Sequence, residues 1–430
     1  MKKIDFFYNA LFVAPVRFLL PVINMFLPKM RERESHIKFN NIPIIKKNNQ
    51  KRLWFHASSM GEFEQAKPII ELIKRKYPDI YIICTFYSPS GYNNQKNYQY
   101  ADSICYMPFD TLKNAKDFVE LINPDLAVFV RYDIWLNHLN ALIKKNIPVY
   151  LICATAPSNK TYLKVFKGYL SYIYGKFNYI FTMTPDAVEY FQSLELRSTI
   201  VPSSDSRFDR IIATVNEYID KPLIAKEVFE DYKVLVVGSS WEPDEKIVST
   251  AVDIYNQNHL KKIKIIYVPH EPTQKHIEKL LVLEPKLVKY SEIEKIESSA
   301  EIKELIKDSH LVVDSIGKLL KLYSNGDIVY IGGAFGAGIH SVTEPAGYGV
   351  PVICGKDFDN SPDAVNMVRL GLLKPIGNMN EMLTFLEYLY ENPEKEKSLA
   401  CKTKDYIFGQ GGASEIISTQ ILKTVFPDSL

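Results

Sequence analysis

The sequence predicts an α/β protein made of two halves, each a parallel β-sheet with helices on both faces. Short apolar runs typical of buried strands recur along the chain, and helix-like segments separate them. A polar, helix-prone stretch near residues 205–230 divides the runs into two sets. The 430 residues, of which 47% are hydrophobic and 24% charged, are enough for two or three folded domains.

The first half contains four strand-like runs after residue 50. They cover residues 53–57, 80–86, 126–130 and 149–154. A helix-like segment, residues 64–77, follows the first run. Strands that alternate with helices favour a parallel sheet, because a parallel strand must be reached by a crossover connection.

The second half repeats this alternation. Its strand-like runs cover residues 233–240, 263–269, 310–314 and 327–333. Two Rossmann-like domains facing a cleft form the GT-B architecture, which is the fold class that we predict. We expect an N-terminal apolar segment, two Rossmann-like domains and a C-terminal helix, at residues 1–35, 36–210, 225–410 and 411–430.

Residues 7–27 form an apolar stretch close to the roughly 20 residues that a membrane-spanning helix needs. Arg17 lies in its middle, and a central arginine costs about 2.5–3.5 kcal/mol on insertion scales. A signal peptide fits poorly, because no small-residue cleavage site follows. A spanning helix is one alternative, and we favour an apolar helix that lies in the membrane interface as an anchor.

Basic residues follow this stretch, as expected beside the anionic cytoplasmic leaflet of the inner membrane. They are Lys29, Arg31, Arg33, Lys38, Lys46, Lys47, Lys51 and Arg52. The sequence therefore predicts contact with a membrane surface at the cytoplasmic face of the cell inner membrane. A solvated linker that happens to be basic is the alternative.

Charge and cysteine content narrow the possible partners. The formal net charge is only +2, whereas a nucleic-acid-binding protein usually shows a strong basic excess, so we expect no nucleic-acid partner. The five cysteines are scattered through apolar runs without a CxxC pair, which is typical of reduced cysteines in a cytosolic protein. The cysteines also show no zinc-ligand spacing, and we predict no metal site.

Ligands of open parallel sheets bind beyond the carboxyl ends of the strands, so the candidate residues are those that follow each run. Glu62 follows the first run near the start of a helix, where a carboxylate could take a proton from a hydroxyl group or simply cap the helix. RYDIWLN, residues 131–137, mixes charge, an aromatic ring and an amide after the third run. An ordinary helix start with a buried Trp135 is the alternative there.

In the second half, Ser239 and Ser240 follow a strand and precede a helix, which suits a phosphate group. Pro269 and His270 follow the next strand, although a lone histidine is more often structural. Lys318 could meet a phosphate or be a solvated helix lysine. The strongest nucleotide-site signal is the glycine-rich segment 331–355, in which Glu344 could accept hydrogen bonds from ribose hydroxyls.

These pieces resemble, in order and spacing, the 3-deoxy-D-manno-octulosonic acid (Kdo) transferase family, over the chain from about residue 5 to the C-terminal region. Seven collinear segments carry the resemblance: HASSMGE (56–62), RYDIWLN (131–137), SDSRFD (204–209), SSWEPDE (239–245), PHEP (269–272), DSIGKL (314–319) and GIHSVTE (338–344). Each motif alone is weak, but seven in order across two domains are specific.

The sequence departs from the family pattern at five positions. They are Arg131 for an acid, Leu136 for proline, Arg207 for lysine, Lys318 for an acid and Ser341 for asparagine. The arginine at 207 keeps the charge but changes its geometry. These changes leave the reaction class intact. They bear on how charge is stabilised and on which acceptor or donor is used.

The resemblance implies that the first domain binds the acceptor, a lipid A precursor such as lipid IVA, and that the second binds the donor CMP-Kdo. Glu62 looks like the family's general base, and transfer would invert the anomeric configuration without metal or other cofactor. Arg131 and Arg207 join Glu62 as catalytic candidates, Arg131 as a contact to an acidic sugar or a phosphate. The residues expected to hold the nucleotide are Ser239, Ser240, Pro269, His270, Gly317, Lys318, Leu319, Ser341, Val342, Thr343 and Glu344.

Two other functions fit the sequence. One is a GT-B glycosyltransferase or a sugar-nucleotide epimerase that uses a UDP-sugar. The other is a non-catalytic, membrane-associated protein that binds sugar nucleotides. Competition between CMP and UDP separates the first from Kdo transfer, and substitution of Glu62 separates the second.

Overall fold

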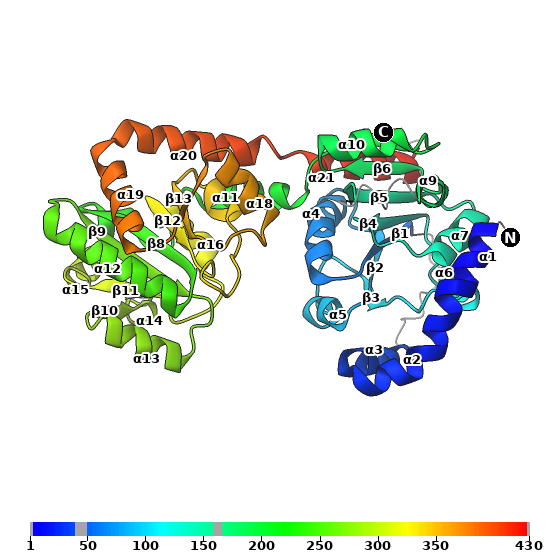
Figure 1. The fold of residues 1–430 in the computed structure, drawn as a ribbon, viewed down its shortest axis with the longest axis horizontal. Helices are drawn as coiled ribbons and strands as arrows, with labels where there is room; N and C mark the ends of the chain where they lie inside the picture. Colours follow the sequence, from blue (N-terminus) through cyan, green and yellow to red (C-terminus); the bar gives the residue numbers. More distant parts are fainter. Residues whose placement is uncertain (1–2, 39–49, 158–165, 428–430) are drawn as a thin grey trace. The chain divides into compact units, whose positions relative to one another are not determined.

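The computed structural model describes residues 3–38, 50–157 and 166–427 (Figure 1). The chain divides into two compact units. Unit 1 comprises Met1–Asp209 and Gln410–Leu430, and unit 2 comprises Arg210–Gly409.

Unit 1 is built on a parallel seven-stranded sheet with the order β3-β2-β1-β4-β5-β6-β7. Its strands are β1 (Arg52–Ala57), β2 (Tyr81–Phe86), β3 (Ser103–Tyr106), β4 (Leu126–Val130), β5 (Val149–Ala154), β6 (Tyr179–Thr182) and β7 (Thr199–Pro202). The helices are α4 (Met60–Lys76), α5 (Pro89–Gln95), α6 (Leu112–Ile122), α7 (Leu136–Lys144), α9 (Lys167–Tyr174), α10 (Pro185–Ser193) and α21 (Ala413–Val425).

The core of unit 1 has one apolar layer on each face of the sheet. Trp54 contributes to one layer, while its neighbours Leu53 and Phe55 contribute to the other. This is the alternation that a strand buried on both faces requires. The C-terminal helix α21 adds Ile417 and Ile421 to the second layer, so the end of the chain completes the core of unit 1.

Unit 2 has a second parallel seven-stranded sheet, with the order β10-β11-β9-β8-β12-β13-β14. Its strands are β8 (Tyr232–Ser240), β9 (Lys262–Pro269), β10 (Leu287–Lys289), β11 (His310–Val312), β12 (Ile328–Ile331), β13 (Val352–Gly355) and β14 (Leu373–Ile376). Its α-helices are α12 (Glu242–Asn258), α13 (Gln274–Leu283), α14 (Tyr290–Ile293), α15 (Ser299–Leu305), α16 (Leu319–Leu322), α17 (Thr343–Gly347), α18 (Pro362–Arg369), α19 (Met379–Glu391) and α20 (Pro393–Phe408). Two 3₁₀ turns, η2 (Lys226–Phe229) and η3 (Tyr323–Asn325), complete it.

The polar stretch near residues 205–230, which was predicted to separate the two domains, is mainly helix α11 (Arg207–Tyr218). This helix passes from unit 1 into unit 2. Asp209 near its start accepts hydrogen bonds from the backbone N–H groups of Gly412 and Ser414, at 2.5 and 2.6 Å. One carboxylate therefore joins the segment that leaves unit 1 to the segment that returns to it.

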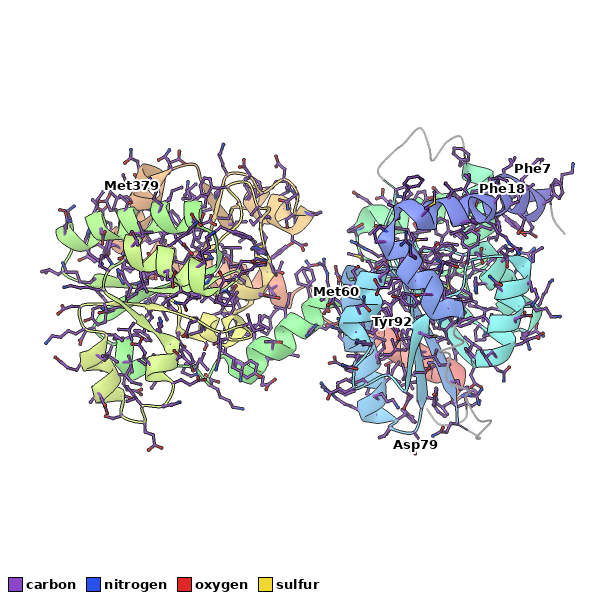
Figure 2. The ribbon with its side chains drawn as sticks, turned by 90° about the horizontal axis from the view of Figure 1, so that it is seen from below. Phe7, Phe18, Met60, Asp79, Tyr92 and Met379 are labelled. Atoms are coloured by element: carbon purple, nitrogen blue, oxygen red, sulfur yellow. The ribbon has the colours of Figure 1, made fainter. Side chains whose placement is uncertain are left out.

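The N-terminal segment is a continuous helix of α1 (Lys3–Tyr8), a π-helical turn η1 (Asn9–Val13) and α2 (Ala14–Phe26), followed by α3 (Pro28–Lys38). Within the described residues, Lys3–Val22 is the one helix whose length and apolar composition would allow it to cross a membrane. Many of its large apolar side chains are exposed, among them Phe7 and Phe18 (Figure 2).

Two residues of the expected basic surface cluster are buried, so that part of the expectation is wrong. Arg33 on α3 is 0% exposed; its guanidinium donates to the carbonyl oxygen of Met107 at 2.7 Å and lies 4.0 Å from the centre of the Tyr87 ring. Arg52 lies in β1, where it donates to a backbone carbonyl. Lys46 and Lys47 lie outside the described residues.

Candidate active site

The strand order places a ligand site in each sheet. In an open parallel sheet, ligands bind beyond the carboxyl ends of the two strands where the strand order reverses. These strands are β1 and β4 in unit 1, and β8 and β12 in unit 2. The motifs HASSMGE and RYDIWLN follow β1 and β4, and the motifs that begin at Ser239 and Gly332 follow β8 and β12.

Glu62 lies in the first turn of α4 and is 6% exposed. Its Oε2 accepts a hydrogen bond from the backbone N–H of Ser59 at 3.0 Å, while the Ser59 hydroxyl accepts from the N–H of Glu62 at 3.4 Å. This is a capping box, which holds the carboxylate at the helix start. Both sequence interpretations of Glu62 are thus compatible: the carboxylate caps α4 and stands at the carboxyl edge of β1.

Asp133 is the second carboxylate at this edge, in the turn after β4. Its Oδ1 accepts from the indole N–H of Trp135 at 2.9 Å, and its Oδ2 accepts from the hydroxyl of Ser58. Nε2 of His56 lies 2.6 Å from Oδ2, a contact that becomes an ion pair when the ring is protonated. Three neighbours thus fix the orientation of this carboxylate.

His56 is itself held from behind. Its Nδ1 lies 2.8 Å from the hydroxyl of Thr85, which also accepts from the indole of Trp54 at 2.8 Å. Since the hydroxyl accepts from Trp54, its proton is free to point at Nδ1, which leaves the imidazole proton on Nε2, toward Asp133. Side chains of the buried strands β1 and β2 therefore fix the orientation of His56 at the polar edge of the sheet.

The two carboxylates have pKa values shifted in opposite directions. Burial raises the pKa of Glu62, and the negative charge of Asp133 raises it further. For Asp133, burial alone would raise the pKa, but His56 and the hydrogen bonds from Ser58 and Trp135 outweigh it and lower the pKa. Paired carboxyl groups with separated pKa values mark an acid–base site, and the one with the raised value is the better base near neutral pH.

The two arginine candidates come from different segments of unit 1. Arg131 follows β4 with a left-handed backbone at φ 62°, which costs a non-glycine residue about 1–3 kcal/mol and is common at functional sites. Arg207 begins α11, and its guanidinium pairs with Asp205 at 2.6 Å. Oδ2 of Asp205 also accepts from the amide of Gln65 on α4 at 3.0 Å. Arg207 is thereby linked to the helix that carries Glu62.

In unit 2, a buried carboxylate organises the edge. Asp244 on α12 accepts from the backbone N–H groups of Trp241 and Gly333, at 3.0 and 2.9 Å, and from the hydroxyl of Tyr330 at 2.8 Å. A Cβ at Gly332 would lie 2.5 Å from a backbone oxygen at the end of β8, so only glycine fits there. The glycine-rich loop is thus packed tightly against the end of β8.

Ser239 and Ser240, the expected phosphate-binding residues, differ in their surroundings. Ser239 has a left-handed backbone at φ 51°, at an irregularity where β8 pairs with β9. Ser240 is fully buried, and its hydroxyl donates to Oε1 of Glu245 at 2.7 Å. The same oxygen of Glu245 lies 3.0 Å from Nε2 of His276.

A stack of three rings stands beside this edge. His270, which follows Pro269 at the end of β9, stacks on Trp241 with 5.2 Å between ring centres and on His340 with 4.3 Å. Nε1 of Trp241 and Nε2 of His340 are buried and find no hydrogen-bond partner among the described residues. Buried polar atoms left unpaired are costly, and a polar ligand would satisfy them.

The remaining nucleotide candidates form two groups. Gly317, Lys318 and Leu319 follow β11; the Lys318 ammonium pairs with Glu294, which raises its pKa, and the Leu319 side chain packs on Gly238 at the end of β8. The other group leads into the short helix α17, and its members are Ser341, Val342, Thr343 and Glu344. The hydroxyls of Ser341 and Thr343 lie 3.3 Å apart.

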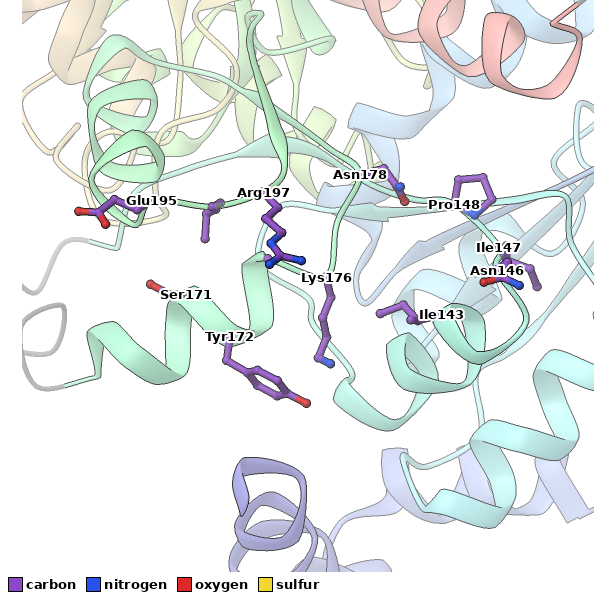
Figure 3. Close-up of a pocket in the computed structure, with 12 residues that line it drawn as sticks. Ile143, Asn146, Ile147, Pro148, Ser171, Tyr172, Lys176, Asn178, Glu195 and Arg197 are labelled. Carbon is purple, nitrogen blue, oxygen red and sulfur yellow. The ribbon is translucent and has the colours of Figure 1, made fainter. Parts of the chain in front are cut away.

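Two other features lie away from these strand ends. A cavity of about 680 Å³ opens beside the residues that precede β5, β6 and β7, at the amino-terminal edge of the unit 1 sheet, and Lys176 and Arg197 line it (Figure 3). Ligand sites of open parallel sheets lie at the carboxyl-terminal edge, so this cavity is separate from the strand-end site.

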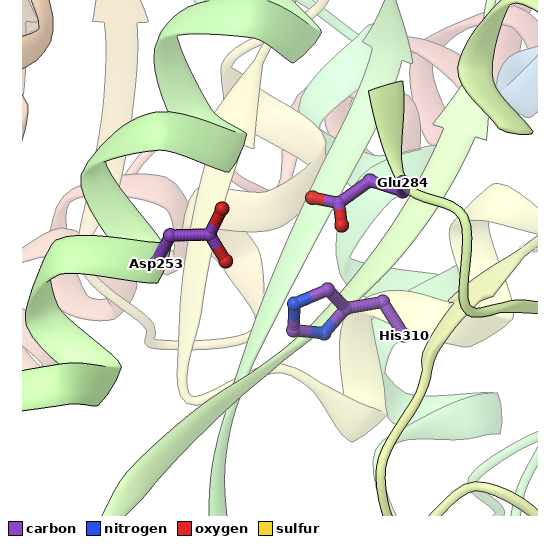
Figure 4. A group of neighbouring side chains, drawn as sticks. All are labelled: Asp253, Glu284 and His310. Carbon is purple, nitrogen blue, oxygen red and sulfur yellow. The ribbon is translucent and has the colours of Figure 1, made fainter. Parts of the chain in front are cut away.

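Among the described residues, one group could hold a metal ion: Asp253, Glu284 and His310 in unit 2 (Figure 4). Nδ1 of His310 accepts a hydrogen bond from the N–H of Ile265 at 3.1 Å, so the proton of the neutral ring lies on Nε2. A ring in this state has no free lone pair for a metal. His310 also begins β11, at the amino edge of the sheet, so the group lies away from the site candidates.

Sequence reasoning missed several residues that organise these edges. His56 and Asp133 lay within quoted motifs, but their contact joins residues 77 positions apart in the chain, by way of β1 and β4. Asp244 is an acid in the first turn of a helix, which sequence patterns interpret as a capping residue. The one local signal was its place four residues after the serine pair that ends β8.

Comparisons with known proteins agree with the motifs. Residues 29–210 match the family model described as 3-deoxy-D-manno-octulosonic-acid transferase. The 3-deoxy-D-manno-octulosonic acid transferase of Rickettsia bellii is 23% identical over 405 residues, which cover 93% of each chain. That of Chlamydophila psittaci is 25% identical over 354 residues, covering 80% of this chain and 78% of the relative.

A third relative is longer. The bifunctional glycosyltransferase/methyltransferase of Fusobacterium nucleatum is 25% identical over 370 residues, which are 82% of this chain but 54% of the relative. The chain thus spans about half the length of that protein.

Solved structures show the same fold at low sequence identity. The UDP-GlcNAc 2-epimerase of Neisseria meningitidis aligns with a TM-score of 0.56 and 16% identity, over 86% of this chain and all of that one. MurG of Acinetobacter baumannii aligns with a TM-score of 0.54 and 16% identity, over 87% and 99%. The predicted GT-B fold class is confirmed by the two parallel sheets and these neighbours. The chain is thus similar over most of its length to 3-deoxy-D-manno-octulosonic acid transferases, and residues 29–210 match the model of that family.

Proposed function

We propose that the protein transfers Kdo from CMP-Kdo to a lipid A precursor such as lipid IVA, with inversion at the anomeric carbon, in lipopolysaccharide synthesis. One observation carries the proposal: two carboxylates with oppositely shifted pKa values, Glu62 and Asp133, stand at the strand-order reversal of unit 1. The similarity to 3-deoxy-D-manno-octulosonic acid transferases suggests the reaction that this acid–base pair serves.

Glu62 is the general base. An acceptor hydroxyl gives its proton to the Glu62 carboxylate while its oxygen forms a bond to the anomeric carbon of Kdo. The bond from that carbon to a phosphate oxygen of CMP breaks, and CMP leaves with the electron pair from the opposite face. Asp133 stays ionised beside His56 and keeps Glu62 basic, since its charge raises the pKa of Glu62.

The donor is held at the carboxyl edge of unit 2. Backbone N–H groups and hydroxyls at Ser239 and at the glycine-rich loop suit the phosphate. The stacked rings of Trp241, His270 and His340, with two unpaired polar atoms, suit a nucleobase. Ribose hydroxyls would be bound by Glu344, and we place the leaving phosphate near Ser240 and Lys318.

The reaction would need no metal ion, because the cationic side chains and helix N-termini supply the charge that a departing CMP requires. Arg131 would contact an acidic sugar or a phosphate of the substrates. The enzyme would work at the cytoplasmic face of the inner membrane, held by its N-terminal apolar helix, because the acceptor is a lipid. These assignments go beyond the similarity to known transferases and are proposals.

The decisive experiment measures CMP release from CMP-Kdo by purified protein, with and without lipid IVA. We expect release that depends on the acceptor and falls by about 10²–10⁴-fold in Glu62→Gln, the usual contribution of a general base. Glutamine can still form the capping box, so the variant tests the base without removing the cap. Glu64→Gln, on the same helix, is the matched control and should keep near wild-type activity.

Full activity of Glu62→Gln would show that Glu62 only caps the helix and is not the general base. Release that requires no acceptor would indicate hydrolysis in place of transfer. If CMP-Kdo gave no release while a UDP-sugar did, the donor assignment would be wrong.

A further inference from the structure

A second cavity lies beside the carboxylate site in unit 1. Its volume is about 700 Å³, within the roughly 300–1,000 Å³ of ordinary small-molecule sites. One wall comes from the N-terminal helix, and the other comes from the turn after β4 and the start of α9. The lining is mostly apolar or aromatic: Ile4, Phe7, Tyr8, Leu11, Phe12, Tyr132, Asp133, Ile134, Trp135, Phe166 and Tyr169.

The N-terminal helix forms this wall because its polar side docks on unit 1. The side-chain amides of Asn9 and Asn137 exchange two hydrogen bonds, at 3.1 and 2.9 Å. Asp5 is 7% exposed and accepts from the hydroxyl of Tyr172 at 2.9 Å. A helix that crossed the bilayer would have to give up these contacts and carry its polar groups into hydrocarbon. The docked helix therefore keeps its polar side on the protein.

The opposite side of the same helix is apolar and exposed. Leu11 is 74% exposed, Phe7 55% and Phe12 47%, and all three also line the cavity. The exposed surface continues along α2 through Phe18 and Leu19, which do not line it. The cavity thus opens on a helix face with the character of an interfacial membrane helix.

The inner end of the cavity reaches the candidate site. Asp133 is the one acidic residue of the lining, and it raises the pKa of Glu62. Trp135 donates to Asp133 and stacks on Tyr87, with 4.6 Å between ring centres. A ligand in the cavity would therefore have its apolar part toward the exposed helix face and its polar end toward the carboxylates.

We propose that this cavity binds a hydrocarbon chain of the lipid acceptor and so sets the acceptor's position at Glu62. The inference rests on the proposed function, and it adds a substrate subsite to it. A hydrocarbon chain fits because the walls are apolar, the opening lies on a membrane-like surface, and the inner end adjoins the groups that would act on a sugar hydroxyl. A protein partner would instead require a flat contact area much larger than such a cavity.

The first test measures chain binding without transfer. A long-chain phospholipid brominated on its acyl chains, in mixed detergent micelles, should quench the fluorescence of Trp135, and Trp135→Phe should lose that quenching. Leu11→Glu should raise the lipid concentration that gives half-maximal quenching at least tenfold. Leu19→Glu should keep that concentration within about twofold of the wild-type value. Both changes put the same charge on the same exposed helix, but only Leu11 lines the cavity. Equal effects of the two changes would overturn the proposal, because they would indicate general adhesion of the helix.

The second test asks whether the chain belongs to the acceptor. The ratio of kcat/KM for acylated over fully deacylated acceptor should fall at least tenfold in Leu11→Glu relative to Leu19→Glu. An unchanged ratio with altered quenching would mean that the cavity holds a membrane lipid and would refute the acceptor subsite. If the wild type transferred nothing, the proposed function would fail, while the quenching would still decide whether the cavity binds a chain.

Discussion

The hydroxyl of Tyr8 donates a 2.8 Å hydrogen bond to Oδ2 of Asp110, which lies 102 residues farther along the chain. Asp110 is fully buried and also accepts from the backbone N–H groups of Asn137 and His138, both at 3.0 Å. A single carboxylate therefore ties the N-terminal helix to the start of α7, directly after the turn that carries Asp133. The helix that would meet the membrane and the turn that holds the second carboxylate share one anchor.

Tyr8→Phe should loosen this anchor. It removes one hydrogen bond to a buried charge, which typically contributes about 1.5–3 kcal/mol, and it leaves the Asp110 carboxylate with its other partners. We expect faster amide hydrogen exchange across residues 3–13 and a lower free energy of unfolding for unit 1. Tyr388→Phe, at an exposed tyrosine of unit 2, is the control. Unchanged exchange in α1 would show that the hydroxyl contributes nothing to docking.

Much of the fold could be predicted because the central strands are buried on both faces. All eight predicted runs are strands in the structure, from β1 to β12, with ends shifted by at most a few residues. The strands that were missed are β3, β6, β7, β10, β13 and β14, each of three or four residues. Such short runs carry little pattern of their own. The equally short β11 and β12 were predicted because each lies within a longer apolar run of the sequence.

The site was predicted in its local parts and missed in its long-range ones. Glu62 is visible in the sequence because a helix start after a strand has a local signature. The pKa shift of Glu62 depends on Asp133, and burial of Arg33 depends on Tyr87 and on a carbonyl far along the chain. Sequence patterns describe neighbours in the chain, whereas these effects come from neighbours in space.

Asp133→Asn should shift the pH profile of transfer toward acid. A base must be deprotonated, so the wild-type rate falls as pH decreases through the raised pKa of Glu62. Removing the charge of Asp133 removes one cause of that raised pKa, so the acidic limb of kcat/KM should move to lower pH. The rate itself should fall by about tenfold or more as a positioned charge is lost.

The matched control for this profile is Asp125→Asn. Asp125 lies just before β4, at the opposite edge of the sheet, where it pairs with Lys51. The acidic limb of kcat/KM against pH should stay at its wild-type position in Asp125→Asn. An acidic limb that stayed in place in Asp133→Asn would contradict the coupling between the two carboxylates.

Glu62→Gln should make unit 1 more stable at neutral pH. The pKa of Glu62 is raised in the folded state, so between the unfolded and folded pKa values the folded protein binds more protons. The stability of the wild type therefore decreases as pH rises through that window, which begins near the unfolded glutamate value of about 4.3. Glutamine has no such loss, so the advantage of the variant should be present at pH 8 and shrink toward pH 4. Urea unfolding followed by the fluorescence of Trp54 and Trp135 measures it, with the exposed Glu120→Gln as control.

Gly332→Ala should disrupt the end of β8, whereas Gly61→Ala should not destabilise the fold. A Cβ at Gly332 would lie 2.5 Å from the carbonyl oxygen of Ser239 and 2.7 Å from Cα of Ser240, so the backbone must move. Overpacking of this kind typically costs about 1–3 kcal/mol or more. At Gly61, apart from the adjoining residues and the backbone of its own helix, no described atom lies within 4 Å of the added carbon. Alanine in a helix is favoured over glycine by up to about 1 kcal/mol. Equal unfolding free energies for the two variants would refute the close packing at Gly332.

His270→Leu should weaken the binding of CMP, because it removes the middle ring of the stack with Trp241 and His340. A base that stacks on an aromatic platform gains about 1–3 kcal/mol, so the Kd for CMP should rise roughly 5- to 150-fold. His259→Leu is the matched control: His259 also stacks on a ring, that of Tyr255, but it lies before β9 at the amino edge of the sheet. Calorimetry with CMP and UMP measures both variants. A similar loss in the two variants would place the nucleotide elsewhere, and tighter binding of UMP than of CMP would favour a UDP-sugar as the donor.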